Sequence, residues 1–257
     1  MKLIKQHSLL LCILSAILVT SCGQMKEEIV INKDGSGVYE MSFDMIPMMR
    51  GMMMGMSKMS EEGMFGEGVD SLELVAQLEE QIWSKFPDEV DSVMDLTRGA
   101  PPAISNDPAK MAIVEKATAF MRGGKSKGYL LSGVNYEFDD AADLEKFMEI
   151  LKEGNKGDSK VDMLMGNSDT EMILTSNSFY RSQKIEPSED PDADLSKARE
   201  LFEGAGITTV ITAPKKIKKL KVKTYKIVER KGNKVTLKID MLDYFTATES
   251  AEVEITW

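Results

Sequence analysis

A strand–turn–strand pattern near the start of the chain constrains its fold more than any other feature. Residues 28–33 have strand composition around the apolar Ile29-Val30-Ile31, and residues 39–45 alternate strictly between apolar and polar side chains. The Asp34-Gly35 pair between them is typical of a tight hairpin turn, because glycine readily adopts the backbone angles that such turns require. The apolar positions of the return strand share one face: Tyr39, Met41, Phe43 and Met45. We therefore predict an antiparallel hairpin with one buried and one solvated face.

The remainder of the chain mixes helix-like and strand-like segments without a regular alternation. Apolar residues at helical spacing predict helices over 70–86, 108–121, 139–151 and 195–202. Alternating and β-branched runs predict strands over 128–138, 161–165, 171–185, 207–212, on both sides of 231–233, and over 251–257. This grouping predicts an α+β fold with a mainly antiparallel sheet and several packed helices.

The first 22 residues have the pattern of a secretory signal peptide. Lys2 and Lys5 precede an apolar run over 9–19, which is shorter than the about 20 residues that a membrane-spanning helix needs. The run ends in Val-Thr-Ser-Cys at 19–22, which resembles a bacterial lipobox. The resemblance implies that Cys22 becomes the acylated first residue of the mature chain, and several acyl chains would hold it permanently on a membrane. The alternative is a simple leader that leaves Cys22 as a free thiol.

The length of 257 residues suits one large domain after this leader. We therefore divide the chain into a signal peptide (1–21), a tether (22–26) and a single α+β domain (27–257) with a Met- and Gly-rich insert at 46–68. No later stretch approaches 18 apolar residues, so the sequence predicts no membrane-spanning helix.

Histidine and cysteine are confined to the leader and its end. The one His is His7, and the two Cys are Cys12 and Cys22. A mature domain without His and with one Cys excludes Ser-His and Cys-His catalytic pairs, His/Cys zinc sites and an intrachain disulfide. Paired carboxylates leave an acid-dependent hydrolase as an alternative. We expect a non-catalytic role and no cofactor.

Methionine is concentrated in one segment, where ten of the 20 Met lie between residues 41 and 64. Three interpretations are open. Thioether sulfur is a soft ligand that suits Cu(I), and helical spacing would bring four Met together: Met49, Met52, Met53 and Met56. A flexible Met surface also adapts to a partner or to the lipid interface. The third interpretation is packing under a sheet, or a mobile insert.

Charge is segregated along a chain whose net charge is −10. Residues 22–213 carry 19 Lys and Arg against 36 Asp and Glu, whereas residues 214–257 carry 11 against 6. The candidate interaction residues in the basic part are Lys215, Lys216, Lys218, Lys219, Lys221 and Lys223. They predict either contact with anionic lipid head groups or an edge strand that lysines protect from aggregation. Nucleic acid is not expected as a partner, because the basic region lacks interleaved aromatic residues.

The chain resembles two groups of envelope lipoproteins. The lipobox, the motif EIVINKDGSGVYEMSFDM, the Met-rich stretch and the late TAPKKIKKL…GNKVTLKID are similar to uncharacterised lipoproteins of the Bacteroidota. The opening hairpin and the Pro-Lys entry to a late strand are remotely similar to the LppM-like lipoprotein domain of mycobacteria, although a C-terminal membrane helix is lacking. Neither resemblance implies an enzyme activity.

We therefore predict a lipid-anchored binding module of the cell envelope. Its acyl chains would hold it on a membrane, the outer membrane being favoured, with the periplasmic or the surface face left open. The expected partners are that membrane and an envelope protein. The alternative is a Met-rich Cu(I)-binding envelope protein.

Overall fold

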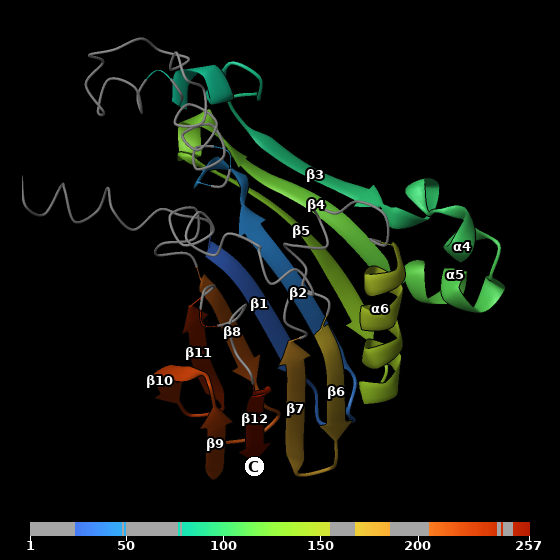
Figure 1. Ribbon diagram of the computed structural model, residues 1–257, viewed down its shortest axis with the longest axis vertical. Helices are drawn as coiled ribbons and strands as arrows, with labels where there is room; N and C mark the ends of the chain where they lie inside the picture. The colour runs from blue at the N-terminus through green and yellow to red at the C-terminus, as the bar shows by residue number, and fades with distance from the viewer. Residues whose placement is uncertain are drawn as a thin grey trace, which may run out of the picture.

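Two β-sheets lie face to face in the computed structural model of the chain, which describes residues 24–47, 79–154, 168–185, 206–240 and 249–257 and the single positions 49, 77 and 243. The larger sheet has eight strands in the order β10-β11-β8-β1-β2-β5-β4-β3. The smaller sheet has four strands in the order β6-β7-β12-β9. Figure 1 shows the smaller sheet in front of the larger one, with helix α6 beside β6 in the front layer.

The strands of the larger sheet are β1 (Gln24–Ile31), β2 (Gly37–Asp44), β3 (Val90–Asp95), β4 (Ala117–Gly124), β5 (Tyr129–Phe138), β8 (Gly206–Thr212), β10 (Lys226–Lys231) and β11 (Lys234–Asp240). Those of the smaller sheet are β6 (Ser168–Leu174), β7 (Ser178–Ile185), β9 (Lys219–Lys223) and β12 (Ala251–Thr256). The helical elements are η1 (Leu96–Gly99), α4 (Pro102–Ser105), α5 (Pro108–Val114), η2 (Lys125–Lys127) and α6 (Ala141–Gly154). The β1–β8 pair is parallel and the other described pairs are antiparallel.

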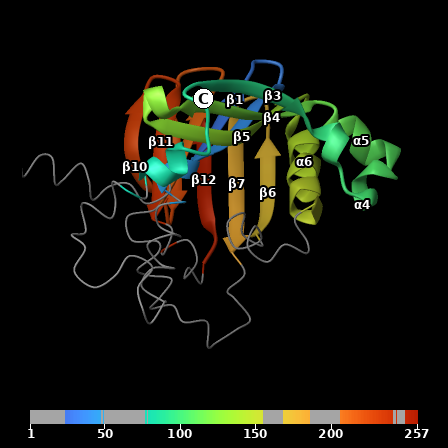
Figure 2. The same ribbon diagram turned by 90° about the horizontal axis from the view of Figure 1, so that it is seen from above.

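The predicted α+β class is wrong, because the chain is mostly β. Strand makes up 52% of the described residues and helix 25%, and the described helices are short. A second sheet therefore covers most of the face on which several packed helices were expected. Figure 2 shows the two layers from above, with β12, β7, β6 and α6 forming the layer opposite the larger sheet.

The helix predicted over 108–121 is divided between two elements. Helix α5 ends at Val114, and β4 begins at Ala117. The segment becomes a strand because β4 forms ladders with both β3 and β5, which satisfy its backbone groups on both sides. Gly123 and Gly124 have φ angles of +134° and +125°, which a continuing helix does not use. Tertiary pairing therefore overrides the helical spacing of the apolar residues.

The predicted hairpin is confirmed, with Ile29 opposite Tyr39 and Ile31 opposite Gly37. Its alternation is less regular than expected, since Tyr39 is fully buried, Met41 is half-buried and the polar Ser42 is buried. Ser42 lies opposite Gly133 of β5.

A Cβ atom on Gly133 would come within 2.4 Å of the Met41 carbonyl oxygen and 2.6 Å of the Phe120 ring, so this position leaves room for glycine and for no larger residue.

The main core fills the space between the two layers. Phe147 of α6 stacks on Tyr136 with 4.0 Å between ring centroids, and it meets Tyr39 edge-on at 6.4 Å. Asp140 caps α6 by accepting a hydrogen bond of 2.9 Å from the backbone N–H of Asp143. Within the part of the chain that the structure describes, no helix combines the length and apolar character needed to cross a bilayer.

Candidate functional site

Most of the residues predicted for lipidation and for copper binding lie outside the part of the chain that the structure describes. Cys22, Met52, Met53 and Met56 lie outside the described residues. Met49 is half-buried and packs against a small apolar cluster formed by Ile46, Ile82 and Leu130. This contact agrees with the packing interpretation for Met49.

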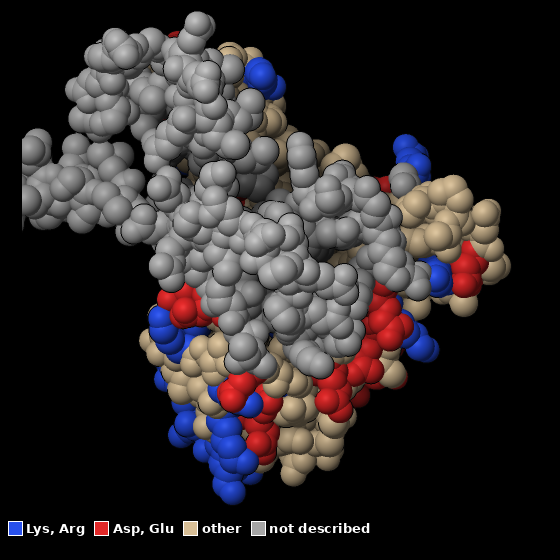
Figure 3. Space-filling view, viewed as in Figure 1, with Lys and Arg blue, Asp and Glu red and all other residues tan. Residues whose placement is uncertain are grey.

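All six predicted interaction lysines are exposed, and they come from one part of the fold. Lys215, Lys216 and Lys218 lie on the crossing from β8 to β9, and the other three lie on β9 itself. Figure 3 shows Lys and Arg side chains gathered at the lower end of the molecule, over β9.

Two of these lysines are paired with acidic neighbours. Strand β9 lies beside β12, in which Glu252 is opposite Lys223 and Glu254 is opposite Lys221. Lys221 Nζ is 2.8 Å from Glu254 Oε2, and Lys223 Nζ is 3.7 Å from Glu252 Oε1. Lys223 Nζ also lies 3.3 Å from Glu249 Oε2. These two residues fit the interpretation of an edge strand protected by lysine.

The other four lysines have no ion pair within the described residues, and we call them the cationic end: Lys215, Lys216, Lys218 and Lys219. The backbone that carries them is fixed by the turn between β10 and β11. The N–H of Ile217 donates to the carbonyl of Gly232 (3.0 Å), and Arg230 Nη2 donates to the carbonyls of Ile217 and Lys218, both at 3.0 Å. The side chain of Ile217, which lies between Lys216 and Lys218 in the sequence, is buried. The cationic end therefore has no acidic partner among the described residues, and its backbone is held by hydrogen bonds to β10 and the β10–β11 turn.

The cationic end is far from the point where the described chain begins. Strand β1 starts at Gln24 and runs toward Ile31, and its parallel partner β8 ends at Thr212, just before the crossing that carries Lys215. Figure 1 shows both strands running down to the end where β9 lies. An eight-residue strand has a length of about 23 Å at about 3.3 Å per residue. Gln24 and the cationic end thus lie at opposite ends of the larger sheet.

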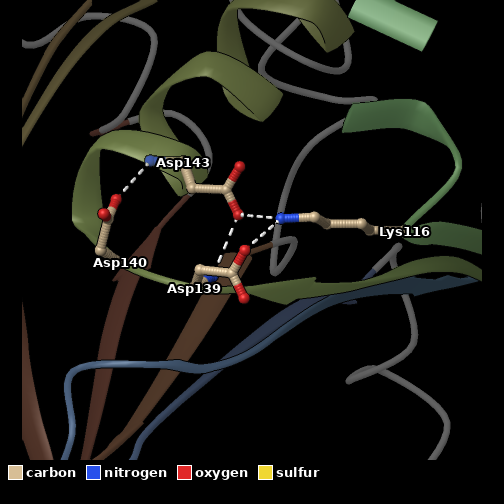
Figure 4. Close-up of polar contacts among 4 residues, drawn as sticks. All are labelled: Lys116, Asp139, Asp140 and Asp143. Carbon is tan, nitrogen blue, oxygen red and sulfur yellow. Dashed lines mark hydrogen bonds and ion pairs between the residues drawn. The ribbon is translucent and has the colours of Figure 1, made fainter. Parts of the chain in front are cut away.

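A second charged cluster lies where α5 passes into β4, opposite the start of α6. Lys116 Nζ is 2.6 Å from Asp139 Oδ2 and 3.0 Å from Asp143 Oδ2. Figure 4 shows the lysine reaching both carboxylates. Asp143 also accepts a hydrogen bond of 3.0 Å from the backbone N–H of Asp139. The cluster joins the start of α6 to the segment between α5 and β4, which are distant in sequence.

The pKa values of the groups in and beside this cluster are shifted away from neutral pH. Hydrogen bonds to Asp139 and Asp143 raise the pKa of Lys116. Burial alone would raise the pKa of Asp143, but the hydrogen bonds from the Asp139 backbone and from Lys116 outweigh it and lower that pKa. Burial raises the pKa of the neighbouring Tyr136 hydroxyl far above its usual range, and Asp143 adds to this shift. None of these three groups exchanges a proton near neutral pH, so the arrangement suits a structural ion pair better than acid–base catalysis.

A buried ion pair joins the two sheets and was not predicted from the sequence. Arg181 Nη1 of β7 donates to Glu27 Oε2 of β1, and Thr209 of β8 donates to the same oxygen at 3.0 Å. Arg181 Nη2 donates to Gln183 Oε1 at 3.1 Å. The carboxylate of Glu27 raises the pKa of Arg181, against the lowering effect of burial, which is the largest single influence. Arg181 stays charged at physiological pH, and its contact with Glu27 joins β7 of the smaller sheet to β1 of the larger one.

One signal in the sequence could have revealed Glu27. It has the same parity as Ile29 and Ile31 along β1, so the period of two places it on the buried face. A charged residue at such a position needs an opposite charge from elsewhere in the fold. Its partner, Arg181, could not be found in the same way, because the pairing of the two sheets is a long-range property.

Within the described residues, no group of three or more His, Cys, Asp or Glu side chains is placed to hold a metal ion. No protein-family model and no curated protein matches the chain. Among solved structures, the chain is similar to the NMR structure of the folded domain of the LppM protein from Mycobacterium tuberculosis, with a TM-score of 0.39 and 9% sequence identity. The match covers 93% of this chain and 91% of that chain. No match bears on the resemblance to lipoproteins of the Bacteroidota, which stays a prediction.

Proposed function

We propose that this protein is a lipid-anchored, non-catalytic binding module of the cell envelope, attached to a membrane through Cys22. The observation that carries the binding role is the cationic end: four exposed lysines without described acidic partners, on a backbone held rigidly by Arg230 and the β10–β11 turn. A preorganised cluster of charge loses little conformational freedom when it binds, which favours a role in recognition.

The position of the anchor limits what the cationic end contacts. One residue, Gly23, separates Cys22 from the start of β1, so an acylated Cys22 would hold that end of the domain against the bilayer. The cationic end would then stand about 23 Å from the anchor, since β1 spans that distance. The Debye length at physiological ionic strength is about 8 Å, so attraction to the anchoring bilayer would be strongly screened. This supports an acidic envelope protein as the partner rather than the head groups of the anchoring membrane.

A non-catalytic role fits the ionisable groups that the structure describes. The pKa values of Lys116 and Arg181 are raised and that of Asp143 is lowered, so all three lie away from neutral pH. Acid–base catalysis works best with groups whose pKa values lie close to the working pH. The two clusters instead join separate parts of the fold.

The lipid anchor is tested by metabolic labelling with radioactive palmitate in the native host. The parent chain and a Cys12→Ser control should take up the label and sediment with membranes, whereas Cys22→Ser should do neither. Cys12 is the matched control because it lies inside the predicted leader. Equal labelling of the Cys22→Ser variant and the parent would refute the anchor.

The cationic end is tested by retention of the full chain on immobilised poly-aspartate in rising salt. The Lys215→Gln/Lys216→Gln variant should elute at lower salt than the parent, because it loses two unpaired charges. The Lys221→Gln/Lys223→Gln variant should elute close to the parent, since acidic neighbours already balance these charges. Equal shifts for the two variants, or a parent that is not retained, would contradict the assignment.

The copper alternative is tested separately. No contact of a described residue favours it, and Met49 packs in an apolar cluster. An anaerobic Cu(I) titration should give the same weak binding for the parent and for a variant in which Met49, Met52, Met53 and Met56 are all leucine. Tight binding by the parent alone would favour the copper function.

A further inference from the structure

Three of the four outer strands of the two sheets are protected against pairing with another chain. β9 carries alternating lysines, and β10 has both basic residues and a register shift between Ile227 and Glu229. On β6, the carboxylate of Glu145 from α6 accepts a hydrogen bond of 2.6 Å from the backbone N–H of Met172. Lysines, bulges and covering elements are the usual means by which proteins block the open edges of sheets.

The fourth outer strand, β3, has none of these devices among the described residues. Its sequence, VDSVMD, contains no Lys, Arg or Pro, and it pairs with β4 over six consecutive residues without a register shift. Two large apolar side chains are exposed on it, Val93 at 61% and Met94 at 52%. A regular strand with exposed apolar side chains is a template for the addition of another strand.

A hollow of about 370 Å³ opens at the end of β3. It is lined by Val93, Asp95, Thr97, Glu115, Ala117 and Thr118. Neither Asp95 nor Glu115 has an ion pair within the described residues, and a hydrogen bond from Thr97 lowers the pKa of Asp95. Two carboxyl side chains, those of Asp95 and Glu115, therefore line a hollow that Val93 of β3 also lines.

We propose that β3 is a docking edge for an extended segment of a partner protein, which adds as a further strand to the larger sheet. Successive side chains of a strand point to opposite faces, so the partner segment would place apolar side chains beside Met94 on one face. On the other face it would place Lys or Arg side chains beside Val93 and in the hollow. Backbone hydrogen bonds along the edge would supply affinity, and the hollow would supply specificity. The charge of the two carboxylates argues for a basic segment.

A second copy of this chain is a poorer occupant. Symmetric antiparallel pairing of two β3 strands about Val93 would place Asp91 directly opposite Asp95 of the other copy, twice in each dimer. Like charges directly opposite each other destabilise a strand pair. A basic partner segment avoids this repulsion and gains from the carboxylates.

The test uses fluorescence anisotropy with the full chain and a labelled, end-capped peptide of alternating Val and Lys. We expect saturable binding that weakens at least tenfold in a Val93→Lys/Met94→Lys variant, which gives β3 the protection seen on β9. The matched control is Ile227→Lys/Val228→Lys on β10, where the side chains are similarly exposed at 50% and 63%. This control should bind like the parent.

Two further arms test the chemistry of the hollow and the choice of occupant. Glu115→Gln should weaken the Lys peptide but not a peptide with Thr in place of Lys. Absence of saturable binding, equal binding of a peptide with Glu in place of Lys, or equal loss in the β10 control would overturn the proposal. Concentration-dependent dimerisation that Val93→Lys/Met94→Lys abolishes would assign the edge to a second copy instead, and would also overturn it.

Discussion

Removal of the guanidinium of Arg181 gives the sharpest test of how the two sheets are held together. In Arg181→Met, the Glu27 carboxylate keeps a side-chain exposure of about 6% but loses its cationic partner. The Thr209 hydroxyl would be the remaining described donor to that carboxylate. A buried charge with one neutral hydrogen bond is poorly compensated for its lost hydration.

The expected loss follows from the burial of the pair. Breaking a buried ion pair by removing one partner costs about 3–5 kcal/mol, whereas replacing both partners by apolar residues is often neutral or stabilising. The Glu27→Leu/Arg181→Met double variant should therefore recover most of the loss. The control is Lys221→Met, which breaks a pair whose side chains are 73% and 44% exposed. For such an exposed pair we expect a loss of about 0–1 kcal/mol.

The assay is equilibrium urea unfolding of the four proteins. Their free energies of unfolding are compared with one common slope of free energy against urea concentration. Arg181→Met should be the least stable and the double variant should lie near the parent. The reasoning would be refuted if Arg181→Met and Lys221→Met lost the same stability. It would also be refuted if the double variant were as unstable as Arg181→Met.

Three further predictions concern the rest of the fold. The lowered pKa of Asp143 means that its carboxylate stabilises the folded state above its unfolded pKa of about 3.9, and this contribution is lost as the pH falls through the folded-state pKa. Asp143→Asn should therefore reduce the difference in melting temperature between neutral and acidic pH, and an unchanged profile would contradict this. Gly133→Ala should cost about 1–3 kcal/mol in urea unfolding by collision with the Met41 carbonyl and the Phe120 ring, and Phe120→Leu in the same chain should recover only a small part of that loss, because the backbone contact remains. Phe147→Ala should cost about 3–5 kcal/mol and should weaken the near-ultraviolet circular dichroism of Tyr136, and an unaltered spectrum would argue against their stacking.

Local patterns predicted most of the described strands. The hairpin of β1 and β2, the strand β5, the capped helix α6 and the final strand β12 all appear close to their expected positions. Each is defined by residues that are near one another in sequence: a turn dipeptide, a period of two, or a cap followed by apolar residues at helical spacing.

The arrangement of these elements could not be predicted in the same way. The parallel pairing of β1 with β8 joins residues 24–30 to residues 206–212, and no local pattern records such a contact. The helix expected over 108–121 failed for the same reason, since its second half pairs with strands on both sides. Long-range pairing also decided the class of the fold, because a second sheet covers most of the core.

The candidate interaction residues show the same division between local and long-range information. The six lysines are all exposed, which the charge of these side chains already favours. Which of them are neutralised depends on β12, because its register places Glu252 and Glu254 opposite Lys223 and Lys221. The cationic end differs from the paired lysines because β12 lies beside β9 and supplies acidic partners to Lys221 and Lys223 only.

The central place of β1 has a consequence for the order in which the chain assembles. This strand is the first described element, yet one of its two neighbours, β8, comes more than 170 residues later. Until β8 has been synthesised, β1 exposes a complete row of unpaired amide and carbonyl groups along one side. Folding must wait for the last quarter of the polypeptide, and contacts of such long sequence separation form slowly. Until its C-terminal strands emerge, a nascent chain of this topology leaves one side of β1 open to pairing with other chains.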